Sequence, residues 1–141
     1  MGRVLGVDLG SRRIGLALSD PDGRVATPHG VIDRSGDTAT DHRTILARAR
    51  EAGASRVVVG LPVSLSGDVG PAARAVLGEV ESLRALAAGE VTVETHDERL
   101  TTVIAERGMR AAGASRAARR RKVDASAAAV MLQSYLEGRR A

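Results

Sequence analysis

Two short apolar runs at the start of the chain constrain its fold most strongly. Residues 4–10 and 14–20 alternate between bulky and small side chains, and only three residues separate the runs. So short a connection between two strand-like runs predicts an antiparallel hairpin. Because successive side chains point to opposite faces of a strand, we expect one bulky face and one small face that is open around Asp8. In the first run these faces are Leu5, Val7 and Leu9 against Gly6, Asp8 and Gly10.

The rest of the chain predicts helices and strands in alternation. We expect strands at 25–32, 56–61 and 91–98, and helices at 41–52, 71–87, 101–113 and 123–136. The continuous apolar run at 56–61 is typical of a central parallel strand. This order predicts an α/β fold in which a mixed five-stranded sheet has helices on both faces. The helix that begins at Pro71 is expected to bury one stripe, made of Ala73, Val76, Leu77, Val80, Leu83 and Ala87.

The length of 141 residues suits one domain, which we expect to span residues 1–141. The absence of cysteine excludes disulfides and thiolate metal sites. No signal peptide and no apolar stretch of about 20 residues is evident, so we expect a cytoplasmic protein without a membrane partner.

Three positions carry acids at strand ends or helix starts, where functional groups gather in open α/β sheets. They are Asp8, the pair Asp97-Glu98 and Asp124. Carboxylates form a hard oxygen site for Mg²⁺ or Mn²⁺. Two such ions can activate water and stabilise the leaving oxygen of a phosphodiester.

Each acid also has a purely structural interpretation. Asp8 could be satisfied by backbone amides, and Asp124 could simply favour a helix N-terminus electrostatically. The pair Asp97-Glu98 could be a charged strand end that binds Arg99. Strand alternation points the two members of that pair to opposite faces, so we expect only one of them to reach a shared site.

Basic residues outnumber acidic ones by 21 to 17, and five of them fall within residues 116–122. Such a local excess favours contact with a polyphosphate, although a solvated basic surface is the plainer interpretation. Aromatic residues make up only 1% of the chain, which argues against stacking of bases on aromatic platforms. The three histidines show no metal-ligand spacing.

Four blocks of the sequence resemble the YqgF (RuvX) family. They are residues 8–20 (DLGSRRIGLALSD), 59–62 (VGLP) with Gly67 and Gly70-Pro71, 97–102 (DERLTT) with 105–107 (AER), and 122–124 (KVD) with 132–136 (LQSYL). The blocks occur in the family's order and cover nearly the whole chain. The resemblance implies an RNase H-like fold and a metal-dependent nuclease of the Holliday junction resolvase group, whose members are also assigned to maturation of the 5′ end of 16S ribosomal RNA.

Carried over by position, the resemblance implies that Asp8, Glu98 and Asp124 are the catalytic acids and bind Mg²⁺ or Mn²⁺, with Asp97 as the alternative metal ligand to Glu98. Junction resolvases of the RuvC type carry a glutamate near the end of the fourth strand, where this chain has Gly60-Leu61-Pro62, so the number of metal ions stays open. The residues expected to bind nucleic acid are Arg13, Arg99, Arg116, Arg119, Arg120, Arg121 and Lys122.

The leading hypothesis is therefore a nuclease acting on structured RNA, such as precursor ribosomal RNA, or on branched DNA, for which a homodimer would be suitable. One alternative is a non-catalytic ribosome or nucleic-acid binding factor with the same fold. Another is an actin-like ATPase or sugar kinase that uses the glycine-rich hairpin as a phosphate loop. That class closes two lobes on its nucleotide, and 141 residues supply only one.

Overall fold

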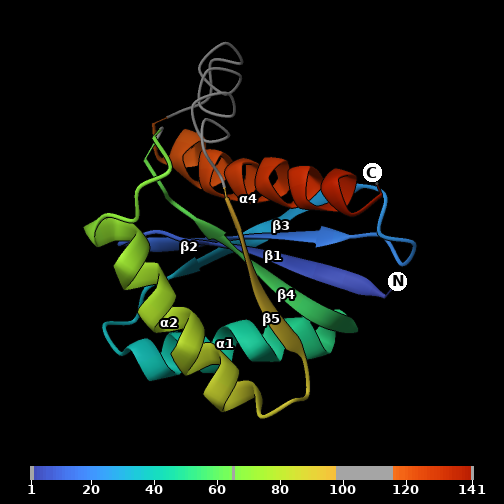
Figure 1. Ribbon diagram of the computed structural model, residues 1–141, viewed down its shortest axis with the longest axis horizontal. Coiled ribbons are helices and arrows are strands. Elements are labelled where there is room, and N and C mark those ends of the chain that lie inside the picture. The colour runs from blue at the N-terminus through green and yellow to red at the C-terminus, as the bar shows by residue number, and fades with distance from the viewer. Residues whose placement is uncertain (1, 65, 98–115, 141) are drawn as a thin grey trace.

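The computed structural model describes residues 2–64, 66–97 and 116–140, which form a five-stranded sheet and three helices (Figure 1). The strands are β1 Arg3–Leu9, β2 Arg13–Ser19, β3 Ala26–Asp33, β4 Ala54–Leu61 and β5 Thr92–Asp97. The helices are α1 Thr38–Glu51, α2 Pro71–Ala87 and α4 Arg116–Arg140. None of the described helices is both long enough and apolar enough to cross a membrane.

The sheet is mixed, with the strand order β3-β2-β1-β4-β5. The first three strands form an antiparallel meander, and β1 pairs in parallel with β4, which pairs in parallel with β5. The expected hairpin, the central parallel strand and the mixed five-stranded sheet are thereby confirmed. β1 lies at the centre of the sheet, so a residue near its end is surrounded by neighbouring strands.

The helices lie on both faces of the sheet, α1 and α2 on one and α4 on the other (Figure 1). The face under α1 and α2 is built from bulky side chains, including Leu5, Val7, Ile14, Leu16, Val57 and Val59, all fully buried. The face under α4 carries small side chains in its centre, and its buried cluster comes mainly from the helix itself, with Met131, Leu132 and Leu136. The two sheet faces therefore hold two separate cores.

The small face of the hairpin is covered, which corrects the expectation that it would be open around Asp8. A Cβ atom added at Gly6 would lie 2.9 Å from the Leu132 Cβ, and one added at Gly15 would collide with the backbone carbonyl of Asp124. These two glycines therefore let the α4 backbone approach the sheet closely. At these positions the glycines make room for a helix.

Two helices begin earlier than the sequence pattern indicates. α4 begins at Arg116 instead of 123, because residues 116–122 consist of the strong helix formers Arg, Ala and Lys. α1 begins at Thr38, since the Asp37 side chain accepts a hydrogen bond from the Thr40 N–H as an N-cap. Leu77 departs from the expected buried stripe of α2 and is 36% exposed. The helix expected at 101–113 lies outside the described residues.

Candidate active site

Asp8 lies near the end of the central strand β1, on the face covered by α4. Its register partner on β2 is Gly15, so no side chain stands between Asp8 and the helix on that side. The side chain is half-buried. The pKa of Asp8 is raised to about 6. Burial is the larger cause, and the negative charge of Asp124 is the second. Asp8 is thus an acid held in a desolvated position beside a second acid.

Asp124 comes to this position because α4 rests on β2. Its backbone carbonyl lies directly over Gly15, the residue opposite Asp8. Its carboxylate accepts a hydrogen bond from Arg13 Nε at 2.5 Å, across 111 residues of sequence. The fold therefore brings together Asp8, Asp124 and Arg13, three of the residues that the sequence predicts for the site.

The structural interpretation of Asp8 is not supported. Among the described residues no backbone amide donates a hydrogen bond to its carboxylate, and the causes of its raised pKa are burial and a like charge. Both causes disfavour the ionised form. A cation placed between Asp8 and Asp124 would relieve both, so the donor set suits a divalent metal ion.

The turn that follows Asp8 is held from the other face of the sheet. Gly10 donates its N–H to the Arg13 carbonyl at 3.0 Å, and its own carbonyl accepts from Arg34 Nε at 3.0 Å. Both terminal nitrogens of Arg34 bind the carboxylate of Glu79 on α2, at 2.8 and 3.0 Å. His42, which is almost completely buried, lies 2.8 Å from the same carboxylate. This network links the turn to α1 and α2.

The electrostatics of the network fit its geometry. Burial raises the pKa of Glu79, but the hydrogen bonds from Arg34 and His42 outweigh it and hold the pKa below its ordinary value. A charged Glu79 keeps Arg34 fixed under the turn. The network was not predicted, since its members come from three separate segments. The one available signal was His42, a polar residue on the buried stripe of α1.

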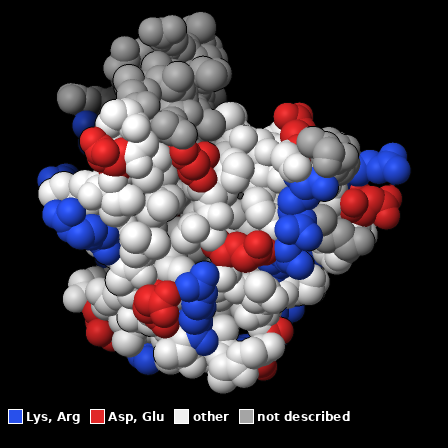
Figure 2. Space-filling model, in the orientation of Figure 1, with Lys and Arg blue, Asp and Glu red and all other residues white. Residues whose placement is uncertain are grey.

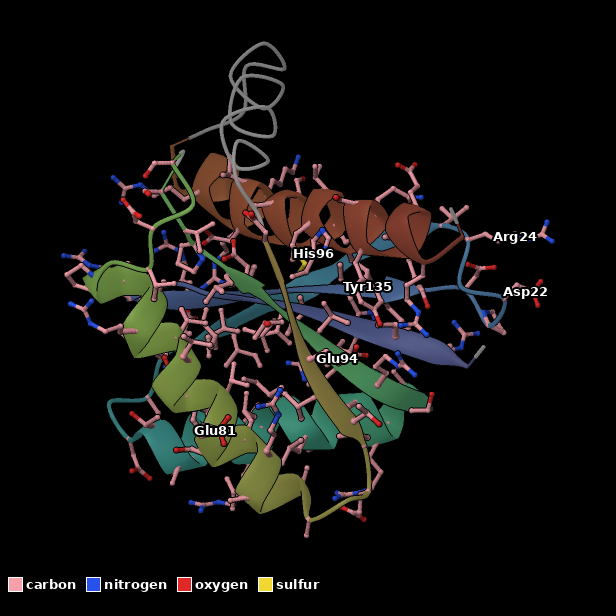
Figure 3. The ribbon with its side chains drawn as sticks, in the orientation of Figure 1. Asp22, Arg24, Glu81, Glu94, His96 and Tyr135 are labelled. Carbon is pink, nitrogen blue, oxygen red and sulfur yellow. The ribbon has the colours of Figure 1, made fainter. Side chains whose placement is uncertain are left out.

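The end of β5 lies level with Asp8. The parallel registers pair Val7 with Val59 and Gly60 with His96, so one step along the strands aligns Asp8, Gly60 and His96. His96 points toward α4, where its Nε2 lies 3.0 Å from the Ser134 Oγ and its ring meets Tyr135 edge-on (Figure 3). Burial lowers the pKa of His96, and Asp97 acts against that shift.

Alternation along β5 then places Asp97, the last residue of the strand. Since His96 points toward α4, Asp97 lies on the opposite sheet face from Asp8. Glu98 and Arg99 lie outside the described residues. Within residues 2–64, 66–97 and 116–140, no group of three or more His, Cys, Asp or Glu side chains is placed to hold a metal ion.

The predicted nucleic-acid contacts on α4 lie in its first turns. Arg120, Arg121 and Lys122 are exposed, and Arg121 pairs with Asp33 of β3 at 2.7 Å. Arg116 and Arg119 belong to the same helix, but their side chains lie outside the described part. On the face drawn in Figure 2, basic and acidic side chains are interspersed and form no continuous basic surface.

The sheet order, the helices on both faces and the acid on the central strand define an RNase H-like fold. Among solved structures, RuvC from Thermus thermophilus in complex with a Holliday junction substrate matches with a TM-score of 0.58 and 19% identity, over 98% of this chain and 96% of that one. A second Thermus thermophilus RuvC structure matches with a TM-score of 0.54 and 20% identity, over 98% of this chain and 96% of that one.

The chain belongs to the RuvX family, whose model is described as a Holliday junction resolvase and matches residues 2–138. A relative from Mycobacterium sp. (strain KMS) is 43% identical over 140 residues, which cover 99% of this chain and 82% of the relative. One from Roseiflexus sp. (strain RS-1) is 41% identical over 139 residues, 99% of this chain and 96% of the relative. Both carry the name "Putative pre-16S rRNA nuclease".

Proposed function

We propose that this protein is a metal-dependent nuclease that hydrolyses phosphodiester bonds, in 5′-end processing of precursor 16S ribosomal RNA, in Holliday junction DNA, or in both. The observation that carries the proposal is the acid pair of Asp8 and Asp124 on the central strand and α4. Nuclease activity accords with the names of the relatives and with the description of the family.

The acid pair of Asp8 and Asp124 suits a divalent ion best. Asp8 and Asp124 would hold Mg²⁺ or Mn²⁺ together with Glu98. When bound, such an ion supplies an activated water and stabilises the leaving oxygen of a phosphodiester. Glu98 is proposed ahead of Asp97, since Asp97, the last residue of β5, lies on the sheet face opposite Asp8.

The chain's own residues would fix the geometry of this site. Arg13 orients the Asp124 carboxylate through its hydrogen bond. Its guanidinium would also contact a backbone phosphate of the substrate. Arg34 binds the turn between Asp8 and Arg13 from the sheet face that α1 and α2 cover, and Glu79 holds Arg34 in place. Phosphates further along the bound nucleic-acid strand would meet the exposed positive charges of Arg120, Arg121 and Lys122.

A cleavage assay with added Mg²⁺ or Mn²⁺ tests the proposal. Precursor 16S ribosomal RNA and a four-way DNA junction are compared as substrates, with a chelator as the metal-free control. Asp8→Asn should abolish cleavage of either substrate. Gly78→Ala, on an exposed position of α2 where nothing lies within 4 Å of the added Cβ, should cleave like the wild type.

The outcome also separates the nuclease from a binding factor. Undiminished cleavage by Asp8→Asn would contradict the assignment of Asp8 to the active site. If the wild type cleaves neither substrate in either metal, and binding of a substrate survives Asp8→Asn, the protein is instead a non-catalytic nucleic-acid binding factor.

A further inference from the structure

Arg12 is an exposed cation in the short turn, residues 10–12, that joins β1 to β2. Its side chain has no hydrogen bond and no ion pair with any residue of the described ranges 2–64, 66–97 and 116–140. Two neighbouring arginines differ from it. Arg13 binds the carboxylate of Asp124, and Arg34 binds the carboxylate of Glu79. The charge of Arg12 is therefore available to a ligand.

The backbone of this turn is held at several points. Gly10 donates its N–H to the carbonyls of Asp8 and Arg13, at 3.1 and 3.0 Å. The Arg34 N–H donates to the Arg12 carbonyl at 2.9 Å, and Arg34 Nε donates to the Gly10 carbonyl at 3.0 Å. Arg34 thus binds both ends of the turn. A fixed backbone lowers the entropy that is lost when Arg12 binds a ligand.

The turn lies at the same end of β1 as Asp8 and continues that strand directly. The hydrogen bond between Gly10 and Arg13 lies two residues beyond the register pair of Asp8 and Gly15. Two strand residues span roughly 7 Å. Successive charges on one strand of a nucleic-acid duplex are about 3.4 Å apart along the axis. A strand whose phosphate lies at Asp8 would therefore bring a nearby phosphate within reach of the turn.

The charges of the acid pair make such a cation useful. Asp8 and Asp124 present negative charge at the place that the phosphates of a substrate must approach. Arg13 is already engaged by the Asp124 carboxylate. An arginine without a partner beside the acids reduces the repulsion and attracts the phosphate backbone.

From this placement we propose that Arg12 binds a backbone phosphate of the substrate near the one that is cut, and that Arg34 is the positioning residue that holds the turn for this contact. The inference rests on the proposed nuclease function and deepens it. The planar guanidinium of an arginine binds a phosphate through two hydrogen bonds. Arg34 acts only through the turn, because its side chain is 17% exposed and both of its terminal nitrogens bind Glu79.

The salt dependence of binding tests Arg12. Each phosphate that a cation neutralises contributes about 0.7 for a single strand and about 0.9 for a duplex to the slope of log K against log salt. Affinity is measured by fluorescence anisotropy between about 50 and 200 mM KCl, with a chelator present so that nothing is cleaved. The probes are a labelled single-stranded RNA and a labelled four-way DNA junction.

Arg24→Gln is the matched control for Arg12→Gln. Arg24 is also an exposed arginine in a hairpin turn, but its turn joins β2 to β3 at the other end of β2, and its side chain points away from the sheet (Figure 3). Both variants therefore lose one exposed positive charge, and only one of them loses it beside the acids.

We expect Arg12→Gln to weaken binding about tenfold at the lowest salt concentration and to lower the slope by one phosphate contact. Arg24→Gln should change neither. Equal slopes in the wild type and Arg12→Gln, or equal changes in both variants, would overturn the proposal. A wild type that binds neither probe would also overturn it.

A double-mutant cycle tests the positioning role of Arg34. Arg34→Met should lower the salt slope as Arg12→Gln does, although Arg34 meets no phosphate. The double variant should bind no more weakly than Arg12→Gln alone, because a displaced Arg12 has no contact left to lose. Additive losses would overturn the positioning role. If Arg34→Met does not fold, Arg34→Lys is judged by the same criteria, since one ammonium cannot bind both the Gly10 carbonyl and the two oxygens of Glu79.

Arg84→Met is the matched control for Arg34→Met. Arg84, in the last turn of α2, also donates its Nε to a backbone carbonyl, that of Val93 at 3.0 Å, and binds the carboxylate of Glu81 at 2.6 Å. Its loss should leave the affinity and the salt slope unchanged. The same decrease of the slope in Arg84→Met would show that the effect of Arg34 is a general loss of structure.

The two proposals can fail separately. Cleavage by the wild type, together with equal salt slopes in the wild type and Arg12→Gln, removes the contact of Arg12 and keeps the nuclease. A selective decrease of the slope in Arg12→Gln, without cleavage by the wild type in Mg²⁺ or Mn²⁺, keeps the phosphate contact and removes the nuclease.

Discussion

The two faces of the sheet differ in the size of the side chains that the strands present. Under α1 and α2 the strands present Leu, Ile and Val side chains that interlock with both helices. Under α4 the same strands present Gly6, Asp8, Gly15 and Ala17, and the helix supplies most of the volume. The first face buries apolar area and so supplies stability. The second gives up side-chain volume, which allows a helix backbone that carries an acid to lie against the central strand.

The difference shows how a small protein can place a costly group without losing its fold. Asp8 is desolvated and close to a like charge, and both conditions oppose its ionisation. The bulky face, with its fully buried side chains on β1, β2 and β4, offsets that cost from the other side of the same strands. Changes on one face should therefore affect function, and changes on the other should affect stability.

The largest expected effect is on the α4 face. Asp8→Asn removes a charge that we propose to bind the metal ion, so the cleavage rate should fall at least about a hundredfold, since metal-ion catalysis is worth several kcal/mol. The rate is measured in single-turnover assays at saturating Mg²⁺. A loss of less than about tenfold would mean that the acid pair is not the reaction centre.

The next effect belongs to the bulky face. Leu16→Ala removes a fully buried side chain of β2 and should lower the free energy of unfolding by about 2–5 kcal/mol. The rate of cleavage per folded molecule should change little. Leu86→Ala on α2 is the matched control, because Leu86 is 42% exposed and its loss should cost less than about 1 kcal/mol. Urea unfolding measures both, and equal losses would contradict the assignment of the core.

The stability of the protein should depend on pH because the pKa of Asp8 is raised in the folded state. The pKa of Asp8 is about 6 in the folded protein, against an ordinary value of 3.8. Between those values the unfolded chain loses its proton while the folded one keeps it, so stability should fall as pH rises from about 4 to 6. The loss is at most about 3 kcal/mol and stays constant above pH 6.

Asp8→Asn lacks this titration and isolates it from that of the other acids. In a chelating buffer the variant should be more stable than the wild type above pH 6, with the difference disappearing near pH 4. Parallel stability curves for the two proteins between pH 4 and 7 would show that the pKa of Asp8 is not raised.

The smallest expected effect comes from adding a single methyl group on each of two elements. Gly15→Ala forces the α4 backbone away from β2 at Asp124 and should cost about 1–3 kcal/mol while also lowering cleavage. Gly78→Ala, in the exposed interior of α2, should stabilise by about 0.5–1 kcal/mol. Thermal unfolding measures both, and a stabilising Gly15→Ala would show that α4 does not lie close to the sheet there.

Much of the fold could be predicted from the sequence, because strand alternation and helix periodicity are local. The pattern of residues 4–20 predicts the hairpin and both of its faces, and the run at 56–61 predicts the central parallel strand, which pairs as expected. The errors are also local in origin. The position where α4 begins depends on helix propensity in residues 116–122, which have no apolar pattern, so the apolar periodicity predicts the helix only from residue 123.

The local sequence pattern is sufficient to predict that Asp8 lies on a strand among glycines and that Asp124 lies on a helix. The tertiary structure makes the two acids neighbours, because their proximity depends on α4 docking against Gly6 and Gly15. It also decided what those glycines do, since a missing side chain has the same sequence signature whether a helix, a metal or a phosphate approaches it. The Arg34–Glu79 support beneath the turn depends in the same way on packing between distant segments, which no local pattern records.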